Sequence, residues 1–345
     1  MAHLVGPSTE QGERVEEEAP VWDTGHDQAQ DNGSPEHPYQ LPFAEIRHRP
    51  RQGLRPTVPV NHRPKSSWLS TGSVVNGTTT RPLIYHHAVE QICNDLASEH
   101  DALDAIVATL TEDQWALDTA AEGWDVADTV VHLIQADMAA RLAVTDPDRF
   151  QQAKADMATK GFEGVFGDKT GKTGAEVLAW WRQERTKMLD AFRGRGPKDR
   201  IAWFGPDMST LSFATARLME TWSHGLDVAD AVGAPWPPSE RIRHVAHIGV
   251  STRGWSYVNR GQEIPAGDIR VELTAPSGEV WTWGPENAEN RVTGSALDFC
   301  LVATQRRHPA DTGLEAEGAL AEEWIGIAQA FAGPPTLPQA SRAGS

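Results

Sequence analysis

The sequence predicts an α+β protein, in which an up-down four-helix bundle precedes a small α+β domain. Two observations lead to this prediction. Before residue 236, apolar residues recur at helical spacing in segments joined by connections of moderate length, which is typical of helices that pack side by side. After residue 268, short runs of alternating apolar and polar residues, separated by a turn, indicate strands placed among further helices.

Residues 1–82 are predicted to form a disordered extension ahead of the bundle. They are rich in Pro, Gly, His, Gln and charge, and they pass from acidic at Glu16–Glu18 to basic between Arg47 and Lys65. Such a segment cannot bury enough apolar surface to offset the entropy lost on ordering. The alternative is a basic docking arm around Arg49, but we favour a solvated tail.

The bundle is expected to occupy residues 83–236. Its four helices are predicted at Leu83 to about Leu110, from the N-cap Asp125 to just before Asp146, Ala175–Phe192, and Ser209 or Ser212 to about Val232. Residues 148–174 are expected to hold a short helix and a Gly-rich stretch. That stretch lacks the earlier glycine and the preceding strand of a phosphate-binding loop, so we do not interpret it as one.

The small α+β domain is expected to occupy residues 237–333, with a disordered tail at 334–345. Its predicted elements are a helix from Arg241 to about Asn259, a hairpin of strands 269–273 and 279–283, a third strand at 291–294, and helices at 295–305 and 319–331.

Composition limits the classes of partner. The formal net charge of −17 argues against a nucleic-acid partner, and no apolar stretch is long enough to span a bilayer. The N-terminus lacks the pattern of a signal peptide, and two cysteines, Cys93 and Cys300, make no disulfide framework, so a cytoplasmic location fits. We expect a monomer or homodimer that acts on a small-molecule substrate.

A candidate metal site is formed by two predicted helices. Glu220 and His224 are four residues apart, so a helix projects both side chains from one face. His132, on the second bundle helix, follows two valines and supplies a third ligand. A Glu-His pair alone is more often a surface contact, but both histidines here stand among apolar residues. The set predicts a divalent metal, with Zn²⁺ preferred and iron, nickel or manganese as alternatives.

Two carboxylates are placed to orient these imidazoles. Asp128 is one turn before His132, and Asp227 is nearly one turn after His224. Carboxylates near ligand histidines commonly accept the second ring proton.

These residues carry a resemblance to a known family. The pattern Gly-Trp-Asp-Val-Ala-Asp-x-x-x-His at 123–132, followed by Glu220-x-x-x-His224-Gly-x-Asp, resembles the DinB/YfiT-like metal-binding superfamily. The nearest branch contains mycothiol-dependent maleylpyruvate isomerase. The resemblance covers roughly residues 83–333 and leaves the N-terminal extension outside.

The resemblance implies a zinc site at His132, Glu220 and His224 in a four-helix bundle. It also implies mycothiol or another low-molecular-weight thiol as a cofactor, used in isomerisation or S-transfer. Members of this family have an arginine in the C-terminal domain, and Gly294-Ser295-Ala296-Leu297-Asp298 followed by Arg306 resembles that arrangement.

Two imidazoles and one carboxylate leave zinc an open position, where a bound thiol ionises near neutral pH. The thiolate can add to an activated double bond, allow rotation and leave, which gives cis–trans isomerisation. If it stays, the result is S-conjugation. A carboxylated substrate needs an anion clamp, and Arg306 is the first candidate, followed by Arg253, Arg307 and His247. Favourable capping of a helix C-terminus is the structural alternative for Arg306 and Arg307.

Two other classes of function remain open. One is a hydrolase that uses metal-bound water, with Asp128 as the general base. The other is a non-catalytic protein that binds a metal or a small molecule. His244 and His247, three residues apart, are interpreted as a helix face turned toward the domain junction and not as a second metal pair.

Overall fold

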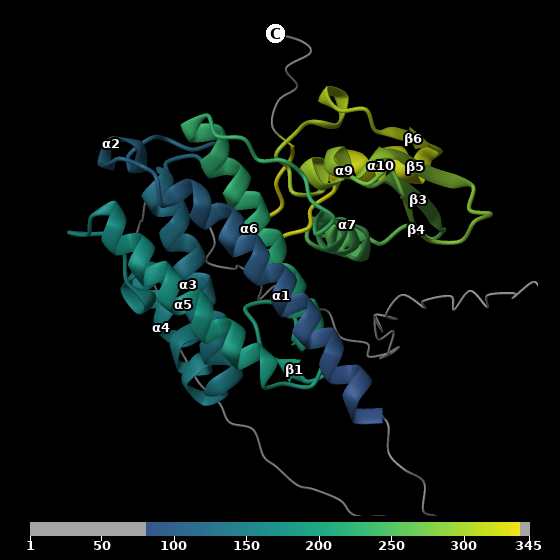
Figure 1. Ribbon diagram of the computed structural model, residues 1–345. Helices are drawn as coiled ribbons and strands as arrows, with labels where there is room; N and C mark the ends of the chain where they lie inside the picture. Colours follow the sequence, from purple (N-terminus) through teal and green to yellow (C-terminus); the bar gives the residue numbers. More distant parts are fainter. Residues whose placement is uncertain (1–80, 339–345) are drawn as a thin grey trace, which may run out of the picture. The chain divides into compact units, whose positions relative to one another are not determined.

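The computed structural model describes residues 81–338 (Figure 1). The predicted extension at 1–82 therefore lies outside the described residues, except for its last two positions, which begin the first helix. The far end of the predicted tail, 339–345, lies outside them as well.

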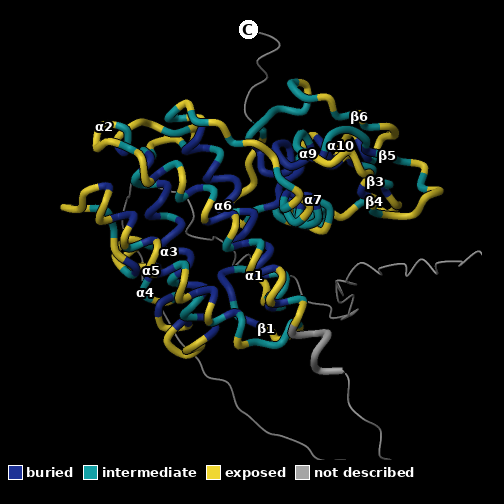
Figure 2. Tube along the Cα trace, in the orientation of Figure 1, coloured by how far each residue is buried: buried dark blue, intermediate teal, exposed yellow. Residues whose placement is uncertain are grey.

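The four predicted bundle helices are all present. They are α1 (Arg81–Val107), α3 (Val126–Thr145), α5 (Gly174–Arg193) and α6 (Thr210–Val232). Helix α3 packs against α5 and α6, and α1 packs against the same two helices on another side. Figure 2 shows that α3 and α6 contain long buried stretches, as expected of helices whose side chains fill a bundle interior.

Local capping explains where these helices begin and end. Asp125 caps α3 as predicted, and its side chain accepts from the backbone N–H of Asp128, whose carboxylate in turn accepts from the Asp125 N–H. Ser209 caps α6 through the N–H of Ser212. Gly233 ends α6 in the left-handed conformation (φ 68°), which glycine adopts without a steric penalty.

The segments between the bundle helices are more helical than predicted. Helix α2 (Glu112–Trp115) forms where a break was expected, because Thr111 provides a complete capping box. The expected short helix is the 20-residue α4 (Pro147–Phe166), interrupted at Gly161 (φ 72°). Buried Phe150 and Phe166 hold α4 against the bundle, and this packing outweighs the poor helix propensity of its glycines.

The C-terminal part is a small sheet flanked by helices. The elements after α6 are α7 (Ile242–Ser251), α8 (Arg253–Val258), β3 (Ile269–Thr274), β4 (Val280–Trp283), β5 (Asn290–Ser295), α9 (Ala296–Ala303), η1 (Pro309–Asp311), β6 (Glu315–Glu317) and α10 (Ala319–Ile327). The strands lie in the order β4-β3-β5-β6, where β3 pairs antiparallel with β4 and parallel with β5, and β6 pairs antiparallel with β5. Before α6, a two-stranded ribbon joins β1 (Arg200–Ile201) to β2 (Met208–Ser209).

The predicted hairpin and third strand are confirmed, but four features differ. The single helix expected at 241–259 is divided into α7 and α8 at Thr252. Strand β6 was not predicted, and the last helix ends at Ile327 instead of Phe331. Residues 334–338, expected in the disordered tail, are described, and the Thr336 hydroxyl donates to Gln305 (2.6 Å).

The hydrophobic core continues from the bundle into the C-terminal part. Leu218 and Trp222 of α6 belong to the same buried cluster as Val245 and Phe299. The connection between α6 and α7 crosses α6 at Gly225, where a Cβ atom would lie 2.5 Å from the Trp236 ring. Only glycine allows this approach.

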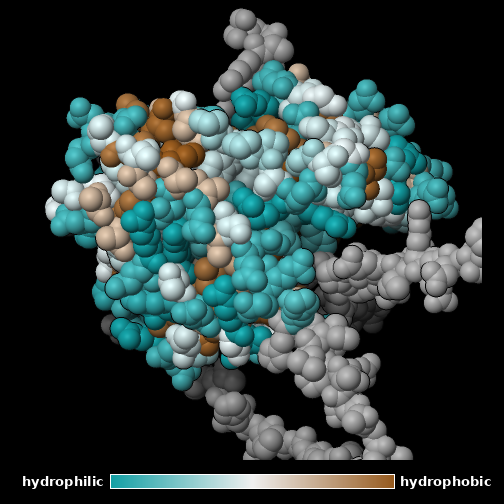
Figure 3. Space-filling view, in the orientation of Figure 1, coloured by the Kyte–Doolittle hydropathy of each residue, from teal (hydrophilic) through white to brown (hydrophobic). Residues whose placement is uncertain are grey.

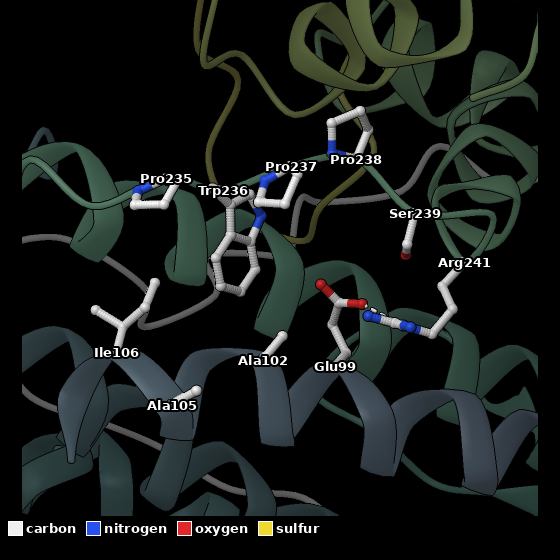
Figure 4. Close-up of a pocket in the computed structure, with 10 residues that line it drawn as sticks. All are labelled: Glu99, Ala102, Ala105, Ile106, Pro235, Trp236, Pro237, Pro238, Ser239 and Arg241. Carbon is white, nitrogen blue, oxygen red and sulfur yellow. Dashed lines mark hydrogen bonds and ion pairs between the residues drawn. The ribbon is translucent and has the colours of Figure 1, made fainter. Parts of the chain in front are cut away.

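A cavity of about 360 Å³ lies between that connection and α1 (Figure 4). Its walls are mainly proline, alanine and Trp236, and the Glu99–Arg241 ion pair stands at one end (2.7 Å). None of the predicted metal ligands lines it.

The surface is largely hydrophilic in the view of Figure 3, with apolar side chains gathered near α2, which is followed by the exposed Leu117. Within residues 81–338, none of the helices has the length and apolar character needed to cross a bilayer.

Candidate metal centre

The three predicted ligands converge between α3 and α6. Nε2 of His132 lies 3.8 Å from Oε2 of Glu220, and Nε2 of His224 lies 3.4 Å from the same oxygen. One donor atom from each side chain lies within 4.8 Å of the others. Donor atoms about 2.0–2.1 Å from a tetrahedral zinc lie on the order of 3.3 Å apart, so the His224–Glu220 separation already fits one ion, and His132 would have to move closer to join them.

A tryptophan covers this cluster, and sequence reasoning assigned it no role at the site. The ring centroid of Trp124 lies 4.8 Å from that of His132 and 5.9 Å from that of His224. Trp124 directly precedes the N-cap of α3, so the turn that begins the helix also places the indole over the imidazoles. An aromatic residue in this position excludes water from one side of the site.

The electrostatics favour the proton-free forms of His132 and Glu220, but they favour the protonated form of His224 as long as no metal is bound. Burial is the main cause that lowers the pKa of His132 to about 4, so its imidazole is neutral at pH 7. Burial alone would raise the pKa of Glu220, but the two imidazoles outweigh it and hold that pKa well below its usual range. Burial opposes protonation of His224 too, yet Asp227 and Glu220 together raise its pKa.

His224 is oriented by Asp227, as predicted. Nδ1 of His224 lies 3.1 Å from Oδ2 of Asp227, which leaves Nε2 directed at Glu220. Asp227 is itself bound by Arg306, whose Nε and Nη2 donate to its two oxygens at 3.2 and 2.7 Å. Burial alone would raise the pKa of Asp227, but Arg306 and His224 lower it to about 2. Arg306, expected to clamp a substrate anion, therefore contacts the site through Asp227.

Asp128 has different partners from those expected. Its carboxylate accepts from the N–H of Asp125 and from Nζ of Lys169 (2.8 Å), and Lys169 also binds Asp125. These contacts fix the start of α3 and connect it to the loop before α5. They do not support either role that the sequence suggested for Asp128, that of a general base or that of a group that orients an imidazole.

The remaining anion-clamp candidates lie in the C-terminal part with contacts of their own. Arg253 donates to the carbonyl oxygens of Gly267 and Pro265, and Nδ1 of His247 accepts from the Trp283 indole (3.2 Å). Burial lowers the pKa of His247 to about 4. The backbone N–H of Arg307 donates to the Leu301 carbonyl (3.2 Å), and within residues 81–338 its side chain has no ion pair within 4.0 Å.

His244 faces the bundle, which agrees with its interpretation as part of a junction. Its Nε2 lies 2.9 Å from Oδ2 of Asp95 on α1. Within residues 81–338, His132, Glu220 and His224 are the one group of three or more side chains placed to hold a metal ion.

A second polar cluster lies between the same two helices. Arg217 of α6 donates from Nε (3.1 Å) and Nη2 (2.9 Å) to Oδ1 of Asp137 on α3, and both side chains are buried. Burial is the main cause that raises the pKa of Asp137 to about 6, while the Arg217 guanidinium acts in the opposite direction and favours the ionised carboxylate. This pair was not predicted.

Comparison with known proteins identifies relatives for most of the described chain. The family described as the mycothiol maleylpyruvate isomerase N-terminal domain matches residues 96–229, and the family described as wyosine base formation matches residues 265–316. Uncharacterized proteins from two strains of Mycobacterium tuberculosis, CDC 1551 / Oshkosh and H37Rv, are 45% identical over 244 residues, which is 70% of this chain and 95% of theirs.

Two solved structures align with the chain. They are crystal structures of the mycothiol-dependent maleylpyruvate isomerase and of a histidine-to-alanine mutant of it, with TM-scores of 0.47 and 0.46. Each is 14% identical to this chain, and each alignment covers 67% of this chain and 94% of the solved one.

Proposed function

The chain belongs to the maleylpyruvate isomerase-like branch of the DinB/YfiT-like superfamily, and from this premise we propose that it is a metal-dependent enzyme that activates a low-molecular-weight thiol for isomerisation or S-transfer on a small carboxylated electrophile. The observation that carries the proposal is the convergence of His132, Glu220 and His224 within 4.8 Å. Two imidazoles and one carboxylate form a donor set that leaves a catalytic zinc an open position.

Each ligand has a defined part in holding the ion. His132 presents a neutral imidazole, and Glu220 contributes the single negative charge. His224 is fixed through Nδ1 by Asp227, so its Nε2 is the atom available to the metal. A divalent cation held by these three atoms supplies the positive charge that lowers the pKa of a thiol in the open position.

Mycothiol is the thiol that we propose, because the family that matches residues 96–229 is described by it. Trp124 provides an aromatic wall beside the two imidazoles, against which an apolar part of the thiol or the substrate could pack. Arg306 donates from Nε and Nη2 to Asp227 and from Nη1 to Thr304, which leaves further N–H groups of the guanidinium for a substrate carboxylate.

The hydrolase alternative has less support. It needs a general base at the metal, and Asp128, the residue suggested for that role, is bound by Lys169 and by the cap of α3. A non-catalytic metal-binding protein would use the same three ligands, so an experiment has to separate that alternative from thiol chemistry.

The test begins with elemental analysis of the purified protein, followed by replacement of the metal with cobalt and addition of mycothiol. We expect about one divalent ion per chain and a new thiolate-to-cobalt absorption band after the thiol is added. His224→Ala should lose most of the metal. His244→Ala is the matched control, because His244 also contacts a carboxylate at 2.9 Å but lies outside the cluster.

Each outcome bears on one part of the proposal. A wild-type protein that binds no metal would remove the site itself. Metal binding without any thiolate band, together with no turnover of electrophilic acids, would favour the non-catalytic alternative.

A further inference from the structure

One residue at the end of α9 has an unusual backbone conformation. Gln305 is the only residue other than glycine with a positive φ (59°) among residues 81–338, and its side chain is buried. A left-handed conformation is unfavourable for a residue with a Cβ atom, so the surroundings have to hold it.

The C-terminal segment holds it. Nε2 of Gln305 donates to the carbonyl oxygens of Ala328 and Thr336, both at 3.0 Å, and its Oε1 accepts from the Thr336 hydroxyl at 2.6 Å. The same segment is fixed to α9 by the Ala330 N–H, which donates to the Ala303 carbonyl at 2.8 Å. All hydrogen-bonding groups of the Gln305 amide are therefore used by residues 328–336.

The turn at Gln305 sets the direction of the next residue. The Arg306 N–H bonds back to the Leu301 carbonyl (2.8 Å), which ends α9, and Nη1 of Arg306 donates to the Thr304 carbonyl (2.8 Å). The rest of the guanidinium reaches across to α6 and binds Asp227 through two hydrogen bonds. Asp227 in turn lies 3.1 Å from Nδ1 of His224.

We propose that Gln305 is a positioning residue for the metal centre, through which the C-terminal segment at 328–336 holds Arg306 on Asp227 and thereby fixes the His224 ligand. The order of contacts is Thr336, Gln305, Arg306, Asp227 and His224. Groups behind ligand histidines typically change metal affinity 10- to 100-fold when they are removed. This inference rests on the proposed function only in requiring that His224 binds a metal.

Zinc affinity, measured by competition with a chelator of known affinity, tests the proposal without reference to turnover. We expect Arg306→Ala to weaken zinc binding by about 10- to 100-fold and Gln305→Ala by about tenfold. Thr336→Val removes only an exposed hydroxyl and should weaken binding by about threefold, because the backbone carbonyl of residue 336 still accepts from Gln305. The cobalt absorption spectrum should change in intensity in the same variants, since the ligand geometry loosens.

Two controls separate positioning from a general loss of stability. Arg241→Ala removes another arginine from a buried carboxylate, Glu99, at the junction with the bundle, but the pair is away from the metal ligands. Thr312→Val removes a hydroxyl that donates to the Pro309 carbonyl (2.7 Å) in the same part of the chain. Both controls should bind zinc as the wild type does.

The decisive comparison is the double variant. If Gln305 acts through Arg306, Gln305→Ala adds almost nothing to the loss of zinc affinity caused by Arg306→Ala. Independent losses that multiply, or wild-type zinc affinity in both Gln305→Ala and Thr336→Val, would overturn the inference while leaving the metal site intact. Absence of metal from the wild type would instead overturn the proposed function.

Discussion

Two polar clusters lie between α3 and α6, and they differ in whether they are complete. Arg217 and Asp137 carry opposite charges and join through two hydrogen bonds to Oδ1 of Asp137, so this pair is complete in charge, although the buried Oδ2 of Asp137 has no hydrogen-bond partner. His132, Glu220 and His224 bring one ligand atom each within 4.8 Å of one another, and this is the donor set that we propose to hold a metal ion. One helix pair thus contains both a structural contact and a donor set.

The difference arises from which residues α6 presents at successive turns. Arg217 is three residues before Glu220, so both lie on neighbouring turns of the same helix. At the Arg217 turn α6 supplies a cation that pairs with a carboxylate, whereas at Glu220 and His224 it supplies two of the three side chains of the candidate metal site. Both clusters are in the bundle interior, where an unpaired charge is costly, so burial increases the energetic effect of losing a partner in either one.

The largest effect is expected from breaking the complete cluster. Arg217→Met leaves Asp137 as a buried carboxylate without its partner, so we expect a loss of about 3–5 kcal/mol in the free energy of unfolding. Denaturant titration at a fixed zinc concentration measures it.

The double variant Asp137→Leu/Arg217→Met is the control, because it removes both charges and replaces them with apolar groups. It should recover much of the lost stability. Equal losses in the single and the double variant would contradict the view that the buried pair, and not the packing of these side chains, causes the effect.

The incomplete cluster should respond to metal instead. When free zinc is about 100 times the dissociation constant, binding to the folded state adds roughly 2.7 kcal/mol to the free energy of unfolding. A chelator should remove this increment from the wild type, and His132→Ala should not show it at all. Arg217→Met, although much less stable, should keep an increment. Identical denaturation curves with zinc and with chelator would show that the cluster binds no zinc.

Sequence periodicity was enough to predict the bundle, since each of its four helices has caps or apolar spacing that act locally. Helix α4 was underestimated because Gly161 and Gly164 argue against a helix, whereas the burial of Phe150 and Phe166 depends on the rest of the fold. Strand β6 has only three residues and forms because β5 offers a partner, which no local pattern shows.

At the candidate metal site, too, local spacing predicted some contacts, and others depend on residues that only the tertiary fold brings close. Glu220 and His224 could be paired from their spacing, and the Val-Val-His pattern pointed to His132. Spacing could not separate Asp227 from Asp128, since both are about one turn from a histidine. A distant residue decides the difference in each case: Lys169 binds Asp128, and Arg306 binds Asp227. Only the tertiary fold brings these residues together.

The smallest effect should come from the cap of α3, the helix that carries one side of both clusters. Asp125→Ala removes the side chain that accepts from the Asp128 N–H and binds Lys169, so we expect a loss of about 1 kcal/mol in the free energy of unfolding. Asp125→Asn keeps most of the cap and serves as the control. Because the cap acts on the helix and not on either cluster, denaturation with zinc and with chelator should show the same loss. A loss confined to the zinc-bound protein would mean that the start of α3, with Trp124 beside it, contributes to metal binding directly.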